Sequence, residues 1–115
     1  NKTMNYTHWK DAQEKKNPHG VDVRQLYDKD SAQAMHISLE PDEKLMPHKT
    51  PVDVFFYVLE GNPTIIIGEE QEKHEKGTLI ESPAYITHYL ANETNQKARI
   101  LVVKALRQTE KTQLL

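Results

Sequence analysis

Residues 42–61, DEKLMPHKTPVDVFFYVLEG, carry the strongest fold signal in this chain. Residues 54–59 within that stretch are dense in β-branched and aromatic side chains, which are the preferred strand formers. Alternate side chains of a strand share one face, so Phe56 and Val58 are expected to point the same way as Val54. The stretch therefore predicts a strand with an apolar face turned towards a protein interior, followed by a turn at residues 60–63.

The same pattern recurs on both sides of this stretch. Alternating or strand-rich runs occupy residues 21–26, 35–39, 64–67, 78–81, 86–90 and 98–104. Strands at intervals of about 8–12 residues, with no long helical period, favour an antiparallel barrel or sandwich over an α/β fold. The mixed-charge run at residues 69–76 is expected to be a hairpin with a solvated face.

Composition narrows the classes of function. The chain has 115 residues, no cysteine and a net charge of −2. Disulfides, thiolate metal sites and cysteine nucleophiles are therefore excluded, and no broad basic surface attracts nucleic acid or membrane. No apolar run approaches the ~20 residues of a membrane span, and residues 1–16 lack the apolar segment of a signal peptide. We expect a cytoplasmic protein.

Three regions are predicted along the chain. Residues 1–19 form a polar N-terminal arm, residues 20–106 a β-barrel domain, and residues 107–115 a polar C-terminal tail. Trp9 stands out in the arm, because an indole usually packs against something. We expect it to tie the arm to the barrel or to a neighbouring subunit.

A second stretch, residues 77–92 (GTLIESPAYITHYLAN), pairs with the first. Together they resemble the two motifs of the cupin superfamily. The first motif, G-x5-HxH-x3–4-E-x6-G, places its first histidine at His48 and its last glycine at Gly61. The second, G-x5-PxG-x2-H-x3-N, runs from Gly77 through His88 to Asn92. The resemblance covers residues 21–104 and implies an all-β antiparallel barrel of the double-stranded β-helix or jelly-roll type, in a small single-domain cupin.

The departures from these motifs bear on metal binding. In a metal-binding cupin the ligands are both histidines of HxH, the glutamate and the later histidine, and this chain keeps only His48 and His88. Thr50 and Val54 stand at the other two ligand positions. Asp53 is one residue early, which turns a strand side chain to the opposite face. The resemblance thus implies a weak or degenerate divalent-metal site of unidentified metal, unless residues outside the motifs complete it.

Two such residues, His36 and Glu81, are candidates to complete the site, depending on which face of their strand is inward. The alternative for the motif histidines is a structural role, with His48 bonded to a loop and His88 to a backbone carbonyl. His8, His19 and His74 lie in polar surroundings and are expected at the surface.

The predicted function is small-molecule binding in the barrel. The expected substrate pocket is formed by Thr50, Val54, Phe56, Val58 and Leu90. In most proteins such apolar residues belong to the hydrophobic core and do not line a pocket. The alternative is a metal-dependent cupin enzyme of dioxygenase, isomerase or decarboxylase type acting on a small oxygenated substrate. Without metal, a histidine can act as general base. The resemblance also implies a homodimer, in which the apolar strand at residues 21–27 would not be left as an exposed edge.

Overall fold

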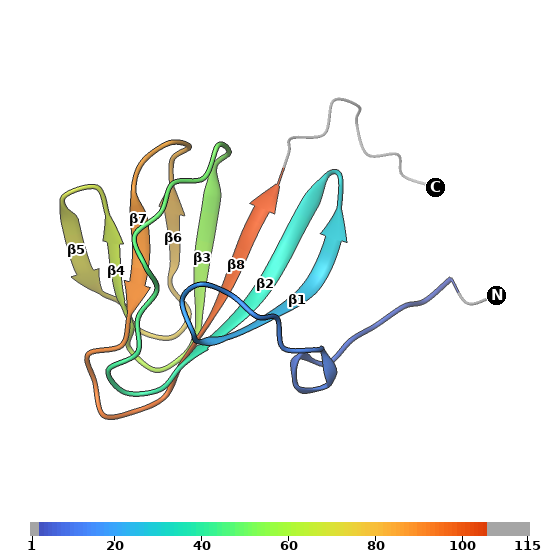
Figure 1. The fold of residues 1–115 in the computed structure, drawn as a ribbon, viewed down its shortest axis with the longest axis horizontal. Coiled ribbons are helices and arrows are strands. Elements are labelled where there is room, and N and C mark those ends of the chain that lie inside the picture. The colour runs from blue at the N-terminus through green and yellow to red at the C-terminus, as the bar shows by residue number, and fades with distance from the viewer. Residues whose placement is uncertain (1–2, 106–115) are drawn as a thin grey trace.

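The computed structural model describes residues 3–105 and is built from two antiparallel sheets (Figure 1). The elements are the 3-10 turn η1 (Trp9–Asp11) and the strands β1 (Asp22–Lys29), β2 (Ala32–Leu39), β3 (Val54–Glu60), β4 (Thr64–Ile67), β5 (Glu70–Lys73), β6 (Leu79–Ser82), β7 (His88–Ala91) and β8 (Ala98–Ala105). The larger sheet has the order β1-β2-β8-β3-β6 and the smaller one β5-β4-β7. The all-β prediction is confirmed. No helix within residues 3–105 is long and apolar enough to cross a bilayer.

The predicted strands agree closely with the observed ones, and β4 has the predicted bounds. Strand β5 carries no periodic signal, because all four of its side chains are exposed. Strand β7 begins two residues later than predicted. A hydrogen bond from the Ile86 backbone N–H to the Pro83 carbonyl belongs to the turn that precedes it.

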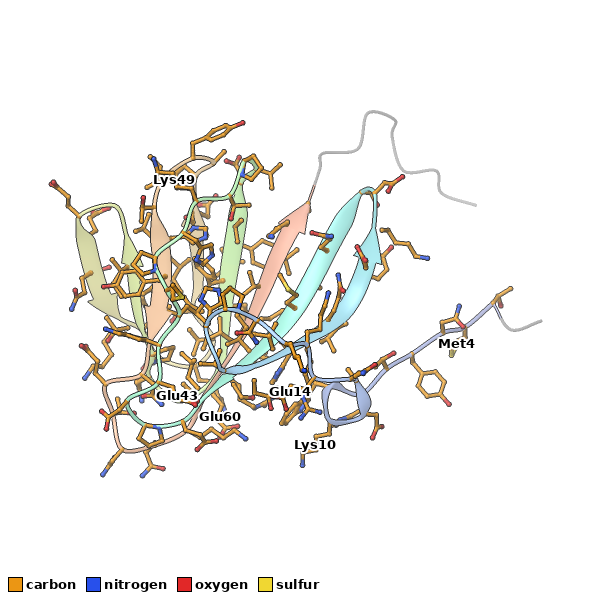
Figure 2. All side chains as sticks on the ribbon, viewed as in Figure 1. Met4, Lys10, Glu14, Glu43, Lys49 and Glu60 are labelled. Atoms are coloured by element: carbon orange, nitrogen blue, oxygen red, sulfur yellow. The ribbon has the colours of Figure 1, made fainter. Side chains whose placement is uncertain are left out.

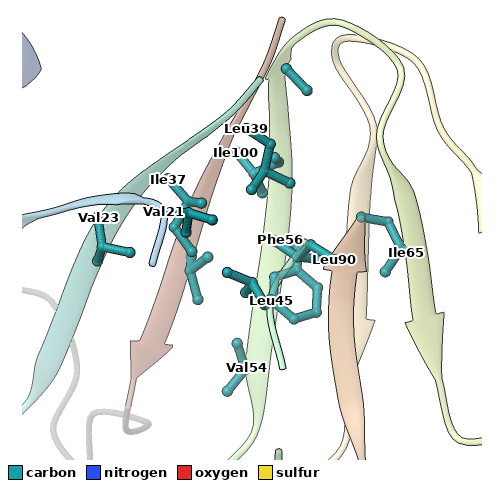
Figure 3. Packing of buried hydrophobic residues seen from close by; sticks show 12 residues of the cluster. Val21, Val23, Ile37, Leu39, Leu45, Val54, Phe56, Ile65, Leu90 and Ile100 are labelled. Carbon is teal, nitrogen blue, oxygen red and sulfur yellow. The ribbon is translucent and has the colours of Figure 1, made fainter. Parts of the chain in front are cut away.

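The hydrophobic core lies between the inner faces of the two sheets (Figure 3). Val54, Phe56 and Val58 are 4%, 2% and 0% exposed, so this face of β3 is inward as the alternation predicted. Phe56 occupies the centre of the cluster and approaches Leu90 of the opposite sheet (Figure 3). Burying an aromatic side chain of this size contributes about 3 kcal/mol, so Phe56 stabilises the packing of the two sheets.

The N-terminal segment crosses the outer face of the larger sheet. The Trp9 ring stacks on His36 of β2, with centroids 4.3 Å apart and planes 11° from parallel. Arg24 of β1 donates to the backbone carbonyls of Trp9, Lys10 and Ala12 at 3.4, 2.9 and 3.1 Å. Trp9 therefore ties the arm to the barrel, while the start of the arm around Met4 extends away from it (Figure 2). The predicted C-terminal tail, residues 107–115, lies outside the described residues.

Two turns retain a left-handed backbone where the family motifs have glycine. Asp42 and Tyr85 have φ values of 70° and 66°, and no other non-glycine residue among residues 3–105 has a positive φ. Left-handed backbone is uncommon for side chains other than glycine, asparagine and aspartate. The two motif positions thus keep the conformation that glycine normally supplies, although the glycines themselves are absent.

Candidate functional site

The two motif histidines come from segments that pair backbone to backbone. The His48 N–H donates to the His88 carbonyl at 3.2 Å, and the His88 N–H donates to the His48 carbonyl at 2.9 Å. Residues that exchange both hydrogen bonds across an antiparallel pair project their side chains to the same side. The two imidazoles accordingly converge, with their Nε2 atoms 3.2 Å apart.

The hydrogen-bond partners of the two Nδ1 atoms indicate which ring nitrogens of His48 and His88 carry protons. Nδ1 of His48 lies 2.8 Å from the Met46 carbonyl, which can only accept, so this nitrogen carries the proton. With its proton on Nδ1, His48 accepts at Nε2, and His88 donates to it from Nε2. The Ser82 hydroxyl, 2.6 Å from Nδ1 of His88, donates in turn. A directed chain of hydrogen bonds thus runs from Ser82 through both imidazoles to a backbone carbonyl.

Burial keeps His88 neutral at physiological pH. His88 is 2% exposed, and this desolvation, followed by the charges of His48 and Lys104, lowers its pKa to about 4. The pKa of His19 is also lowered, first by burial and then by His48. Neutral imidazole is the form that ligates a metal, so His88 is in the metal-binding form at pH 7.

The imidazoles border a cavity of about 150 Å³ between the sheets. It is lined by Asn17, Pro18, His19, Val23, Met35, Ile37, Leu45, His48, Thr50, Val54, Phe56, His88, Val102 and Lys104. The predicted pocket residues Thr50, Val54 and Phe56 are therefore on its wall. Val58 and Leu90, predicted with them, are both 0% exposed and lie in the core away from this cavity.

Part of the cavity wall was not predicted by any motif. The arm supplies Asn17, Pro18 and His19, and the end of β8 supplies Lys104. His19, expected at the surface, is half-buried, and its Nδ1 accepts the Met46 N–H at 2.7 Å. Its ring centroid lies 5.3 Å from that of His48. Among these residues, only Lys104 could have been found from the sequence. The alternation of β8 gives it the same parity as inward-facing Val102.

A larger hollow of about 500 Å³ lies elsewhere, beside β5 and β6. Exposed glutamates including Glu70, Glu72 and Glu81 rim it, and neither motif histidine reaches it. The smaller cavity is the better candidate site, because it combines an apolar wall with convergent polar groups.

The donor set for a metal is incomplete among the described residues. The two Nε2 atoms are close enough to share an ion, since metal–nitrogen bonds are about 2.0–2.1 Å long. Thr50 Oγ1 lies 3.5 Å from His88 Nε2, but a neutral hydroxyl is a poor ligand and Val54 offers none. No group of three or more histidine, aspartate, glutamate or cysteine side chains suited to a metal occurs within residues 3–105.

The side chains considered as replacements for the lost ligands face elsewhere. His36 is buried beneath Trp9 on the outer side of the larger sheet. Glu81 is exposed beside the larger hollow. Asp53 accepts the backbone N–H of Ala84 at 2.8 Å, as expected for a side chain on the face opposite Val54. None of the three lines the cavity between the sheets.

The family model described as "Cupin domain" matches residues 35–104, and the chain belongs to this family. No curated protein matches the chain. Among solved structures, the TT1209 protein of Thermus thermophilus is 25% identical, with 91% of this chain and 100% of that chain covered and a TM-score of 0.76.

Two further solved structures share the fold. The polyketide cyclase RemF of Streptomyces resistomycificus is 22% identical, with 94% of this chain and 83% of that one covered and a TM-score of 0.78. A predicted oxalate decarboxylase of Thermotoga maritima is 18% identical, with 87% and 97% covered and a TM-score of 0.76. At these identities the similarity extends to the fold, and fold alone does not assign a reaction.

Proposed function

We propose that this chain binds a small molecule in the cavity between its sheets, in contact with His48 and His88. The observation that carries the proposal is the cavity of about 150 Å³, apolar on most sides, against which two imidazoles converge. A cavity of about this volume in another protein, lined by apolar side chains, admits benzene. The ligand is therefore expected to have an apolar body of about that size and one polar group that meets the imidazoles.

Comparing two substitutions on one strand tests this proposal. Val102 lines the cavity and its neighbour Val103 faces the other side of β8, so Val102→Phe fills the site and Val103→Phe is the matched control. Thermal-shift screening against small acids, alcohols, sugars and nucleotides is expected to find ligands that stabilise the wild type and Val103→Phe. The proposal is wrong if Val102→Phe, folded by circular dichroism, responds to the same ligands with the same shifts.

A weak divalent-metal site at the same position is the second part of the proposal. His48 would hold the ion through Nε2, because the Met46 carbonyl fixes its Nδ1 as a donor. His88 would do so after its proton moves from Nε2 to Nδ1, where the Ser82 hydroxyl can turn to accept it. A bound metal would supply Lewis acidity to an oxygen of the ligand. With two protein ligands instead of the usual three or four, occupancy is expected to be partial.

Elemental analysis of untagged protein measures this occupancy directly. Bound zinc, manganese or iron is expected to fall in His48→Ala and His88→Ala and to remain in His74→Ala, whose imidazole lies outside the cavity. Metal content that neither motif substitution changes would contradict the metal site and leave ligand binding intact. Thermal shifts that require added metal would favour the metal-dependent enzyme, whereas metal-independent shifts favour binding alone.

The enzyme alternative rests on the hydrogen-bond chain. His48 and His88 are linked by their Nε2 atoms at 3.2 Å, so a ligand proton taken by one imidazole can be shared with the other. Oxygen incorporation, isomerisation and decarboxylation remain the candidate reaction classes. A ligand from the screen that is converted by the wild type and bound unchanged by His88→Gln would establish this alternative.

A homodimer is also proposed. Strand β1 is an edge of the larger sheet, and Tyr27 on it is 49% exposed. Met4 and Tyr6, on the extended start of the arm, are 74% and 80% exposed. Exposed edges and apolar arms are normally covered, and a second copy can cover both. Light scattering is expected to give twice the 13.3 kDa chain mass, and a monomer mass would contradict the dimer.

A further inference from the structure

Lys104 places a positive charge at the cavity wall. The residues of β8 alternate, and Lys104 has the parity of the inward-facing Ile100 and Val102. It pairs across the sheet with Val54, whose side chain also lines the cavity. The lysine is partly buried and lines the cavity together with the two motif histidines.

No acidic side chain accompanies this charge inside the cavity. The wall contributed by residues 3–105 contains no aspartate or glutamate, and Lys104 forms no ion pair within that range. Asp28 and Asp30 line a separate surface hollow that the lysine also borders, but neither pairs with it among the ion pairs of residues 3–105. Lys104 is partly buried, so an anion held in the cavity could form a charge-assisted hydrogen bond with its ammonium group.

The remaining polar groups of the cavity do not substitute for an acidic partner. The positive charge of Lys104 disfavours protonation of His88, and this is one of the causes that lower the pKa of this histidine. Thr50 and Asn17 are neutral. A negatively charged ligand would relieve this imbalance, because its charge would meet the ammonium group while its body filled the apolar part of the cavity.

We propose that the cavity selects a small organic monoanion, with its carboxylate on Lys104 and an apolar body about the size of a benzene ring against Phe56 and Val102. This rests on the proposed small-molecule binding and adds the charge of the ligand to it. The imidazoles of His48 and His88 lie on the same wall, and a second oxygen of the ligand can replace one of them as partner in the hydrogen bond between their Nε2 atoms.

Benzoate and benzamide test the charge separately from the shape, since the two are close in size. Titrations followed by amide NMR shifts are expected to show benzoate binding to the wild type about tenfold more tightly than benzamide, because an ionic hydrogen bond is about twice as strong as a neutral one. Lys104→Met is expected to remove this preference and Lys104→Arg to keep it. Lys73→Met, at an exposed lysine of β5, is the matched control and is expected to behave as the wild type.

The outcomes separate the two proposals. Equal binding of benzoate and benzamide, unchanged in Lys104→Met, would overturn the anion preference and leave small-molecule binding standing. Failure of both probes to shift any resonance of a cavity residue at millimolar concentration would contradict the anion site and count against the binding function as well. If Lys73→Met weakens benzoate binding as much as Lys104→Met does, the assignment to Lys104 is overturned. The effect would then follow from the net charge of the protein and not from the position of the lysine.

Discussion

Acidification is expected to destabilise this barrel through His36. This side chain is 1% exposed, and Arg99 donates to its Nε2 at 2.9 Å, so Nδ1 carries the proton and has no partner among the described residues. Burial, followed by the charge of Arg99, lowers the pKa of His36 to about 4, from an ordinary value of 6.5. At 1.36 kcal/mol for each pH unit between the two values, the difference corresponds to about 3 kcal/mol of folding free energy.

The direction in which pH changes the stability depends on whether the folded or the unfolded chain binds the proton at His36. Between pH 6.5 and about 4 the unfolded chain protonates His36 and the folded chain does not, so unfolding gains a proton and stability falls as pH falls. The contribution is complete above pH 6.5 and the loss levels off below pH 4. His88 behaves in the same direction, because its pKa is also lowered to about 4, and it continues to contribute when His36 is replaced.

Urea unfolding at several pH values measures the effect. Glutamine can still accept from Arg99, so His36→Gln is the informative variant, and His8→Gln at an exposed position is its control. Between pH 7.5 and 4, His36→Gln is expected to lose about 3 kcal/mol less of its unfolding free energy than the wild type or the control loses. A pH dependence identical in all three proteins would refute the assignment of acid sensitivity to His36.

Three further experiments on variants have defined outcomes. Thr50→His combined with Val54→Glu restores the ligand set implied by the family motif, and elemental analysis is expected to find about one divalent metal per chain. Metal content no higher than in the wild type would speak against that alignment. Tyr85→Gly is expected to be about 1 kcal/mol more stable to urea than Tyr85→Ala, since φ is 66° there, and equal stability would show that the left-handed backbone carries no strain. Gly61→Ala is expected to cost about 3 kcal/mol in the same assay, because its Cβ would lie 2.5 Å from the Lys97 carbonyl oxygen. A loss below 1 kcal/mol, about the cost of the backbone alone, would show that the turn relaxes freely.

The fold was predictable because its signals are local. Strand β3 is predicted by its own alternation, and the spacing from His48 to Gly61 and from Gly77 to Asn92 aligns the chain with the family motifs. The positive φ values at Asp42 and Tyr85 show that this alignment survives even where the motif residue has changed. Strand β5 was harder to place, because an edge strand with four exposed side chains has no apolar face to reveal its period.

The site was predictable only in part, because some of its residues meet through tertiary packing. The pairing of His48 with His88 and the place of Thr50 follow from the motifs, and Val54 and Phe56 follow from strand parity. Asn17, Pro18 and His19 reach the cavity because the arm folds across the barrel, and nothing in their local sequence encodes that path.

Tertiary packing also decides which face of a strand is inward when the sequence pattern allows either face. The alternation of β2 leaves the inward face undecided, and the stacking of Trp9 on His36 assigns that histidine to the outer side. Val58 and Leu90 share inward parity with cavity residues, yet they are enclosed by the core instead of lining the cavity. Parity therefore predicts which side of a strand is inward and does not predict where along that side a cavity opens.

Nitrogen-15 spectra of the imidazoles during a titration test the central claim most directly, because they observe His48 and His88 at the cavity itself. With benzoate and benzamide as probes, the Nε2 signals of these two histidines are expected to shift in proportion to binding, while those of the exposed His8 stay in place. Binding of a probe, shown by a thermal shift, that leaves both motif imidazoles unchanged would contradict ligand binding at this site.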